Sequence, residues 1–306
     1  MKSTNKKILL VVAGPTASGK TSLAIQLALH FKAEIISADS RQFYKELPIG
    51  TAAPTTFELN QVKHHFVGNI SIIDTFDVAT YEKEVLELLV KLFMKHDVLI
   101  LSGGSGLFID AICNGLDELP ETSNEIRNNV KEIYLTEGLS GLQQRLENLD
   151  PDYFHIMDKQ NPRRLQRALE VCLETGNTYS SYRTSPRKKR PFDILKIAIY
   201  TDRNELIERI NQRVEKMMFE GLLDEVKELS EHRILNALNT VGYKELFDYL
   251  DGKYTLDQAV DKIKINTRRY AKRQMTWFRK NDDYNWFSRN EVSQIIEFVN
   301  QYIQCV

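Results

Sequence analysis

Cysteine is scarce in this chain of 306 residues, and neither sign of charge dominates it. The three cysteines, Cys113, Cys172 and Cys305, show neither disulfide-like pairing nor the spacing of zinc ligands. This argues for a reducing compartment and against a structural zinc. Lysine and arginine number 41 and aspartate and glutamate 42, for a net charge of −1. The chain as a whole therefore has no strong attraction for a polyanion, and nucleic-acid binding would depend on local basic clusters.

Long apolar runs are also missing. No run approaches the roughly 18 residues that a membrane-spanning helix requires. The apolar run at residues 8–13 is shorter than the roughly 7–15 residues of a signal-peptide core. We interpret it as a buried strand and expect a cytoplasmic monomer without a membrane segment.

What the sequence does contain is an alternation of short apolar runs and amphipathic stretches. Helical periodicity covers "TSLAIQLALHF" and "TYEKEVLELLVKLFMKH". Strand, helix, strand, helix in this rhythm predicts an α/β fold, with a P-loop NTPase-like parallel sheet core. The predicted strands are 8–13, "AEIISAD", "VLILSGG" and "ILKIAIYTD".

The middle of the chain has a different character. Residues 118–191 contain helical stretches such as "NEIRNNVKEIYL" and several prolines, but no buried strand. We predict a helical insertion domain over 118–191, between the two parts of the core at 1–117 and 192–306.

A phosphate-binding motif follows the first strand. Its glycines let the backbone curl into an anion-binding nest at a helix N-terminus. Lys20 supplies a positive charge to the outer phosphates, and the Thr21 hydroxyl is placed to hold Mg²⁺. The motif comprises Gly14, Pro15, Thr16, Ala17, Ser18, Gly19, Lys20 and Thr21.

Polar residues follow the second predicted strand in "SADSRQFYK". Asp39 is placed at the carboxyl end of that strand, the edge where open α/β sheets bind ligands. It is a candidate general base or metal ligand, and a helix N-cap formed by Asp39 or Ser40 is the structural alternative. Arg41 and Gln42 can donate to a phosphate or to a base edge.

The third predicted strand ends in glycines, in "LSGGSGLF". They form a tight turn or let a substrate approach the backbone. The carboxylate that ends a typical Walker-B strand and binds Mg²⁺ is absent, so the match to an NTP hydrolase is imperfect.

Basic residues gather in "NPRRLQR", "RTSPRKKRP" and "TRRYAKRQMTWFRK". Such clusters are typical of a solvated face or of a nucleic-acid backbone site. Tyr270 and Trp277 lie within the last cluster as core or base-stacking residues. Arg209 and Arg213 share a helix face; Arg213 either clamps a diphosphate or pairs with Glu205 or Glu208.

Three functions fit these residues: an ATP-dependent small-molecule kinase, a transferase that expels a diphosphate, and a non-catalytic RNA-binding module. The order of "GPTASGKT", "ISADSRQFYK", "HHF", "LSGGSGLF", "NPRRLQRALEV", "VGYKEL" and "TRRYAKRQMTWFRK" resembles the bacterial tRNA dimethylallyltransferases over about residues 8–288. That family transfers a dimethylallyl group from dimethylallyl diphosphate to the exocyclic amine of the adenosine 3′ of the anticodon, with Mg²⁺, and releases diphosphate.

The resemblance implies roles for particular residues. Asp39 matches the carboxylate that takes the amine proton, and Lys20, Thr21 and Arg213 match the residues around the diphosphate and Mg²⁺. The insertion and the C-terminal basic helix would hold the anticodon stem-loop of the tRNA. Phe108 replaces the family's usual tyrosine. The residues implied in tRNA binding are Asp39, Ser40, Arg41, Gln42, Ser105, Arg127, Arg163, Arg164, Leu165, Gln166 and Arg167.

Overall fold

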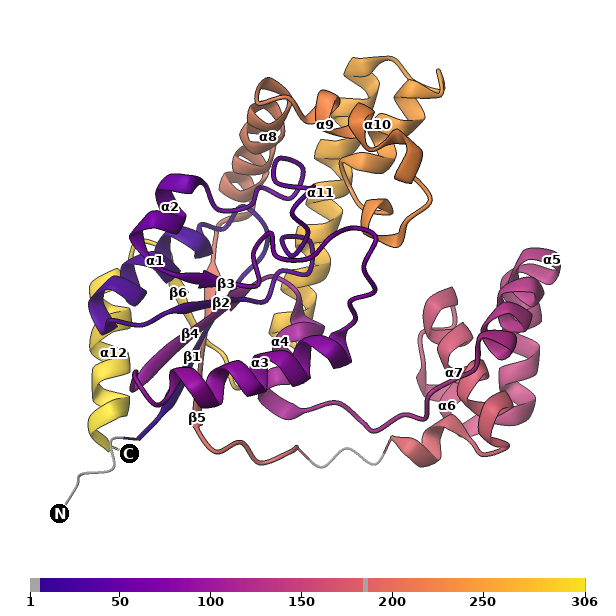
Figure 1. Ribbon diagram of the computed structural model, residues 1–306, viewed down its shortest axis with the longest axis horizontal. Helices are drawn as coiled ribbons and strands as arrows, with labels where there is room; N and C mark the ends of the chain where they lie inside the picture. Colours follow the sequence, from indigo (N-terminus) through magenta and orange to yellow (C-terminus); the bar gives the residue numbers. More distant parts are fainter. Residues whose placement is uncertain (1–5, 184–186, 306) are drawn as a thin grey trace. The chain divides into compact units, whose positions relative to one another are not determined.

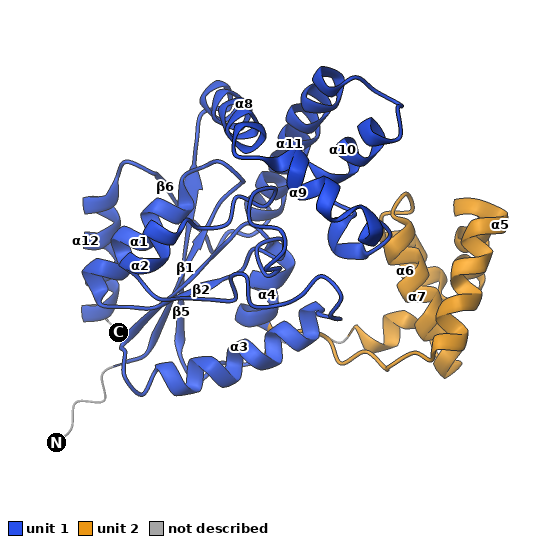
Figure 2. Ribbon diagram, turned by 45° about the horizontal axis from the view of Figure 1, so that its top comes forward, with its two compact units in different colours: residues 1–114, 189–306 blue, residues 115–188 orange. Residues whose placement is uncertain are grey.

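The computed structural model describes residues 6–183 and 187–305 (Figure 1). The chain forms two compact units, which Figure 2 distinguishes by colour: residues 1–114 with 189–306, and residues 115–188. Each boundary of the smaller unit lies three residues earlier than the predicted insertion at 118–191. Residues 184–186 of the predicted basic cluster "RTSPRKKRP" fall outside the described residues.

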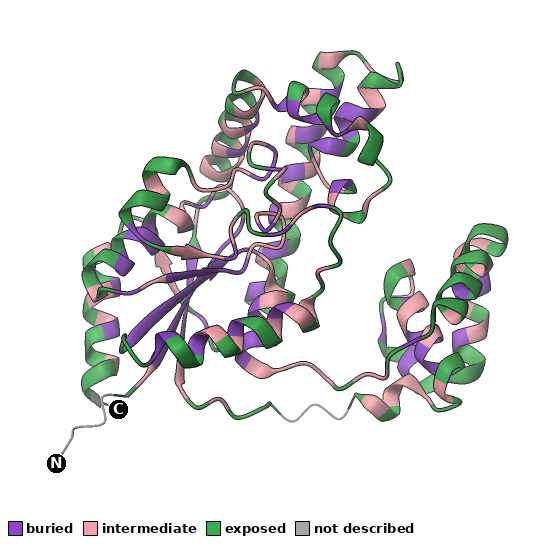
Figure 3. Cartoon of the chain, viewed as in Figure 1, coloured by how far each residue is buried: buried purple, intermediate pink, exposed green. Residues whose placement is uncertain are grey.

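The larger unit is built on a parallel sheet. Among the described residues its strand order is β3-β2-β4-β1-β5-β6, and each neighbouring pair is parallel. The apolar central strands are buried on both faces, as parallel strands covered by helices are (Figure 3). The strands are β1 Ile8–Ala13, β2 Ile35–Ser37, β3 His64–His65, β4 Val98–Gly103, β5 Asp193–Tyr200 and β6 Asn285–Ser288.

Helices cover both faces of this sheet, and β1 shows how. Its side chains alternate, because successive residues of a strand point to opposite faces. Leu9 and Val11 pack in a core with α3 and α4, whereas Leu10 and Val12 pack with α1 and α12. The helices are α1 Lys20–Phe31, α2 Thr56–Gln61, α3 Val78–Leu92, α4 Gly106–Asn114 and α12 Val292–Cys305.

A helical extension follows β5 and has an apolar core of its own, in which Val214, Leu222, Tyr243 and Ile263 are buried. Leu47 joins this core, so the segment after β2 packs against the extension. The long helix α11 runs back from the extension to the sheet (Figure 1). Its elements are α8 Arg203–Phe219, α9 Leu222–Glu228, η2 Ser230–His232, η3 Asn236–Leu238, α10 Tyr243–Leu250 and α11 Leu256–Arg279.

The smaller unit is helical and is organised around a buried aspartate. The Asp150 carboxylate accepts hydrogen bonds from the backbone of Tyr153 and from both the backbone and the hydroxyl of Ser180. It therefore caps α6 and links η1 to the junction between α5 and α6. The elements are α5 Asn124–Leu149, α6 Pro151–Ile156, α7 Pro162–Thr175 and η1 Tyr179–Tyr182.

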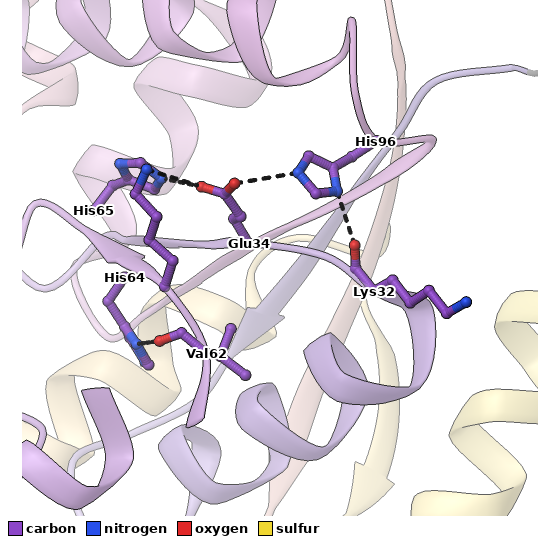
Figure 4. A network of polar contacts seen from close by, with 7 residues as sticks. Lys32, Glu34, Val62, His64, His65 and His96 are labelled. Carbon is purple, nitrogen blue, oxygen red and sulfur yellow. Dashed lines mark hydrogen bonds and ion pairs between the residues drawn. The ribbon is translucent and has the colours of Figure 1, made fainter. Parts of the chain in front are cut away.

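The edge strand β3 is only two residues long and polar, and a network of side chains helps to hold it (Figure 4). Glu34, just before β2, contacts His65 Nε2 at 2.6 Å and His96 Nε2 at 3.2 Å. His96 Nδ1 lies 2.8 Å from the carbonyl oxygen of Lys32. One carboxylate thus joins β3, the start of β2 and the turn before β4.

In the part of the chain that the structure describes, no helix combines the length and the apolar character needed to cross a membrane.

Candidate active site

The phosphate-binding motif joins β1 to α1 at the carboxyl edge of the sheet. Its backbone turns back on itself at Ala17 and Gly19, where φ is 64° and 92°, and the Ser18 amide donates to the Pro15 carbonyl. A positive φ at a non-glycine residue such as Ala17 costs about 1–2 kcal/mol. This strained loop ends at the N-terminus of α1, where anions are favoured.

Lys20 lies under this loop. The residue is 8% exposed, and its ammonium group lies 3.4 Å from the Pro15 carbonyl. Burial lowers the pKa of Lys20 to about 8, with a further lowering by Arg213 and an opposing effect of Asp39. A bound anion would favour the charged form of this side chain and raise its pKa again.

Two arginines of α8 reach the same loop. Arg213 donates to the Thr16 hydroxyl at 2.9 Å and lies 3.4 Å from the Ala52 carbonyl. Burial lowers the pKa of its guanidinium group, and Asp39 opposes that effect. Arg209 donates to the Ala17 carbonyl at 2.6 Å and lies 4.0 Å from Glu205. Glu205 pairs more closely with Arg289, at 3.0 Å, so that both Arg209 and Arg213 contact the phosphate loop.

A cleft of about 720 Å³ opens above the loop. Its walls are the phosphate loop, the segment 48–58 and α8, and both Lys20 and Arg213 line it. Pro48, Ile49, Ala52, Pro54 and Met217 give one part of the wall an apolar character. The cleft therefore combines basic and apolar lining residues, and Glu58 and Glu220 also line it.

A second, much smaller cavity of about 20 Å³ lies between the ends of β2 and β4. Lys20 and Thr21 line both spaces, and Asp39, Ser37 and Ser102 line the smaller one. The predicted base thus shares a cavity with the phosphate-loop lysine. Ser102 stands at the end of β4, where a Walker-B strand carries its carboxylate.

Asp39 lies in a turn, not at the start of a helix, so the N-cap alternative is wrong. Its carboxylate accepts the Arg41 amide at 3.2 Å, and its carbonyl accepts the Gln42 amide. The Arg41 guanidinium donates to the carbonyls of Gly50 and Val241. The Gln42 amide group donates to the Ala52 carbonyl at 2.9 Å. The polar groups of Arg41 and Gln42 therefore brace the wall of the cleft.

The segment after β4 packs against this turn. The Ser105 hydroxyl accepts the Ser40 amide and lies 3.1 Å from the Ser40 hydroxyl. It also contacts Tyr270, whose pKa is raised by burial and by the nearby Asp39. Tyr270, half-buried, therefore lies close to the predicted base. The Phe108 ring packs edge to face against Phe43 and Tyr81.

The glycines of "LSGGSGLF" are required by the protein's own contacts. A Cβ at Gly103 would lie 2.2 Å from the Ala38 carbonyl oxygen, and one at Gly106 would lie 2.3 Å from Trp277. Trp277 is 37% exposed and donates to the carboxylate of Asp110. The close approach is thus between segments of this chain.

The other predicted RNA contacts lie in the smaller unit. Arg127 and Arg167 both donate to the Thr122 hydroxyl, which brings the two guanidinium groups together. Arg163 and Arg164 are exposed at the start of α7, and Gln166 is partly buried. The Leu165 side chain is fully buried in the core of the unit, so that it can support this surface only from beneath.

The residues present fit a magnesium ion that a diphosphate would help to bind. The described residues contain no cluster of three or more His, Cys, Asp or Glu side chains suited to a metal. Mg²⁺ commonly binds through one or two protein oxygens, substrate phosphates and water. Thr21 lines both cavities, and its hydroxyl is a candidate for such an oxygen.

Sequence reasoning missed Gln274, which contacts the phosphate loop from α11. It also missed Glu225, whose carboxylate accepts the amides of Ile49 and Gly50 and the Tyr243 hydroxyl. Both lie far from the motif in sequence, and an uncharged glutamine within "TRRYAKRQMTWFRK" is inconspicuous among its basic residues.

Residues 42–281 match the IPP transferase family. The chain is 49% identical to tRNA dimethylallyltransferase 1 of Bacteroides fragilis, over 97% of this chain and 99% of that protein. It is 50% identical to the Bacteroides thetaiotaomicron protein of the same name, over 95% and 94% of the two chains.

Solved structures agree with this result. The full-length tRNA isopentenylpyrophosphate transferase of Bacillus halodurans superposes with a TM-score of 0.73 at 33% identity, covering 98% of this chain and 97% of that chain. A eukaryotic dimethylallyltransferase described as acting on tRNA gives a TM-score of 0.79 at 26% identity, over 94% and 75% of the two chains. With a family match over most of its length and relatives near half identity, this chain belongs to the IPP transferase family.

Proposed function

We propose that this protein transfers a dimethylallyl group from dimethylallyl diphosphate to the exocyclic amine of the adenosine 3′ of the anticodon in tRNA, and releases diphosphate. The observation that carries the proposal is the placement of Lys20 and Arg213 on one cleft, with Asp39 sharing the adjoining cavity with Lys20. Cations that hold a leaving group and a carboxylate that accepts a proton are the two elements this reaction needs.

The phosphate loop and the α8 arginine hold the diphosphate. Negative charge accumulates on the diphosphate as its bond to the prenyl carbon breaks. Lys20, Arg213 and the loop amides stabilise that charge in a partly desolvated site, where such interactions are strong. The apolar wall beside them suits a five-carbon chain. Mg²⁺, held with the Thr21 hydroxyl, would supply further positive charge to the diphosphate.

Asp39 receives the proton. The exocyclic amine of adenine is a weak nucleophile; its nitrogen forms a bond to the prenyl carbon while the carbon–oxygen bond to diphosphate breaks. The proton then passes from nitrogen to the Asp39 carboxylate. Hydrogen bonds from the backbone amides of Arg41 and Gln42 hold Asp39 in place, and Ser40 and Ser105 border the same turn.

The tRNA must present its base away from the stack to reach this edge of the sheet. We assign the anticodon stem-loop to basic residues of the smaller unit, at Arg127 and along α7 from Arg163 to Arg167, and to α11. We propose a cytoplasmic enzyme, because the tRNA of bacteria such as those of its relatives is cytoplasmic. We propose that the enzyme acts as a monomer, because one copy of the chain supplies the cleft, Lys20, Arg213 and Asp39.

A labelling experiment tests the proposal. The protein is incubated with labelled dimethylallyl diphosphate, unmodified tRNA and Mg²⁺, with and without ATP. We expect label in the tRNA, release of one diphosphate per prenyl group and no requirement for ATP. Consumption of ATP with a phosphorylated product would support the kinase alternative instead, and tight tRNA binding without any transfer would support the RNA-binding module.

A further inference from the structure

Gln274 lies on the buried side of α11 and bridges two loops of the site. The residue is 5% exposed. Its side-chain oxygen accepts the backbone amide of Thr16 in the phosphate loop at 2.8 Å. Its side-chain nitrogen donates to the Gly104 carbonyl after β4 at 2.9 Å. One amide group therefore links the phosphate loop, the end of β4 and α11.

The surroundings of this amide are closely fitted. A Cβ at Gly104 would lie 2.3 Å from the Gln274 nitrogen, so the loop approaches the side chain as only glycine allows. Thr16 is held from its other side as well, since its hydroxyl accepts Arg213. The conformation of the phosphate loop at Thr16 thus depends on both α8 and α11.

The opposite side of α11 is basic and exposed. Arg269, Lys272 and Arg273 flank Gln274 in sequence and face solvent, whereas Ala271 and Phe278 are buried with it. This side of α11 is where the proposed function places tRNA. The same helix therefore carries a polyanion-binding face and, on its other face, a direct contact with the phosphate loop.

We propose that Gln274 is a positioning residue that couples tRNA binding on α11 to diphosphate binding in the phosphate loop. The proposal rests on the proposed function for the identity of the two ligands. A shift or ordering of α11 under bound tRNA reaches Thr16 through one hydrogen bond and Gly104 through the other. Because such coupling is reciprocal, diphosphate binding strengthens tRNA binding by the same factor.

The chemistry of the link dictates the variants. Thr16 presents an amide donor and Gly104 a carbonyl acceptor, so the bridging group must accept at one end and donate at the other. Gln274→Met has a similar length and does neither. Gln274→Glu accepts from Thr16 but, when ionised, cannot donate to Gly104. Gln301→Met, on the exposed surface of α12, is the matched control.

The experiment uses the full chain and measures the Kd of inorganic diphosphate with Mg²⁺ by calorimetry, with and without saturating unmodified tRNA. For the wild type and Gln301→Met we expect tRNA to tighten diphosphate binding by about fivefold or more, the lower range of coupling between sites. For Gln274→Met we expect the two Kd values to agree within about twofold. Thermal unfolding checks that the variants fold, and Gln274→Glu carries the comparison should the methionine variant fail to fold.

Two outcomes overturn the proposal: a wild type whose diphosphate affinity is indifferent to tRNA, and Gln274 variants that keep the wild-type ratio. If a Gln274 variant loses diphosphate affinity equally with and without tRNA, the ratio of the two Kd values is unchanged. That result belongs to the second outcome and marks Gln274 as a purely structural contact. Failure of the proposed function is seen separately, since it removes prenyl transfer in the labelling assay whatever the ratio of Kd values.

Discussion

The protonation state of the Lys20 side chain depends on whether an anion is bound beside it. In the free protein burial lowers its pKa to about 8, so this group is charged below that pH and neutral above it. A bound diphosphate favours the charged form and raises the pKa again. Binding above pH 8 must therefore take up a proton.

We predict how the Kd of inorganic diphosphate, measured with Mg²⁺, compares between Lys20→Met and the wild type. The ratio of the variant Kd to the wild-type Kd should be constant below about pH 7. Above pH 8 this ratio should decline, by a factor that approaches tenfold per pH unit. Calorimetric titrations from pH 6.5 to 9.5 measure it, and Lys95→Met serves as an exposed control. A ratio that stays constant to pH 9.5 contradicts the lowered pKa.

At Asp39 we predict a loss of turnover without a loss of RNA binding. Asp39→Asn keeps the size of the side chain and removes the base, and kcat should fall by about a hundredfold or more, as for a general base. The Kd for tRNA should stay within about twofold. Single-turnover transfer and filter binding measure the two, with the exposed Asp224→Asn as control. A variant that loses tRNA binding and keeps turnover rejects the assignment.

At Arg213 the expected effect falls on the diphosphate substrate. Arg213→Ala removes a charged donor from the cleft, and such hydrogen bonds contribute ~1.5–3 kcal/mol. The KM for dimethylallyl diphosphate should rise about tenfold or more, with the KM for tRNA unchanged. Arg203→Ala, exposed at the start of the same helix, is the comparison. An unaltered KM for the diphosphate rules out the clamp.

At the scale of elements, strong periodicity and complete motifs could be predicted, and short polar elements could not. The strands β1 and β4 and the helices α1 and α3 follow from apolar runs and 3.6-residue spacing. The strands β3 and β6 are two and four residues long and hold polar or partly exposed side chains. They pair because the sheet edge beside them is open, which their own sequences do not reveal.

The same distinction applies to the site. The phosphate loop and the place of Asp39 could be predicted, since both follow buried strands of a parallel sheet. The contacts of Gln274 and Glu225 come from helices more than a hundred residues away from the loops they hold, and only the packing of α8–α11 brings them there. The resemblance groups Leu165 with the arginines of its segment, whereas its periodic position on α7 puts it in the core.

The Glu34 network makes a prediction about β3 and its neighbours. Although burial opposes ionisation, hydrogen bonds from His65 and His96 lower the pKa of Glu34 from 4.5. A lowered carboxyl pKa stabilises the fold at pH above its unfolded value, and that contribution is lost as pH falls through the folded value. Glu34→Gln should therefore reduce the free energy of unfolding by about 1–3 kcal/mol at pH 7.

Denaturant unfolding at several pH values measures this difference. The difference should shrink as the pH falls below the ordinary carboxyl pKa of 4.5, because the wild-type carboxyl then becomes protonated. Glu84→Gln, exposed on α3, is the control. A difference that persists unchanged to pH 3 contradicts an ionised Glu34 in the network.

At the scale of the whole molecule, the smaller unit is an insertion whose two ends are anchored at one place on the core. Arg190, just after the unit, donates to the carbonyls of Ala111 and Ile112, just before it, and pairs with Glu82 at 2.7 Å. These contacts lie within the larger unit, and they hold the segment before β5 against the end of α4.

We predict that replacing residues 115–188 by a Gly-Ser linker of about six residues leaves a folded core. It should bind inorganic diphosphate with Mg²⁺ within about threefold of wild type, because the cleft belongs entirely to the larger unit. Affinity for tRNA should fall at least tenfold, since the arginines of α7 are removed. Calorimetry and filter binding measure both; a deletion that binds tRNA normally contradicts the assignment of the insertion to RNA.

The position of β1 between β4 and β5 also sets an order of events during synthesis. β1 leaves the ribosome first, but its pairing with β5 joins Ile8 to Asp193 and must wait until the inserted unit has been made. The local contacts of α5 with α7 can form in that interval, and a folded insertion shortens the flexible loop whose closure opposes the pairing. The nascent chain therefore exposes one long side of β1 until the second half of translation, and this is the period when the protein is most open to misassociation.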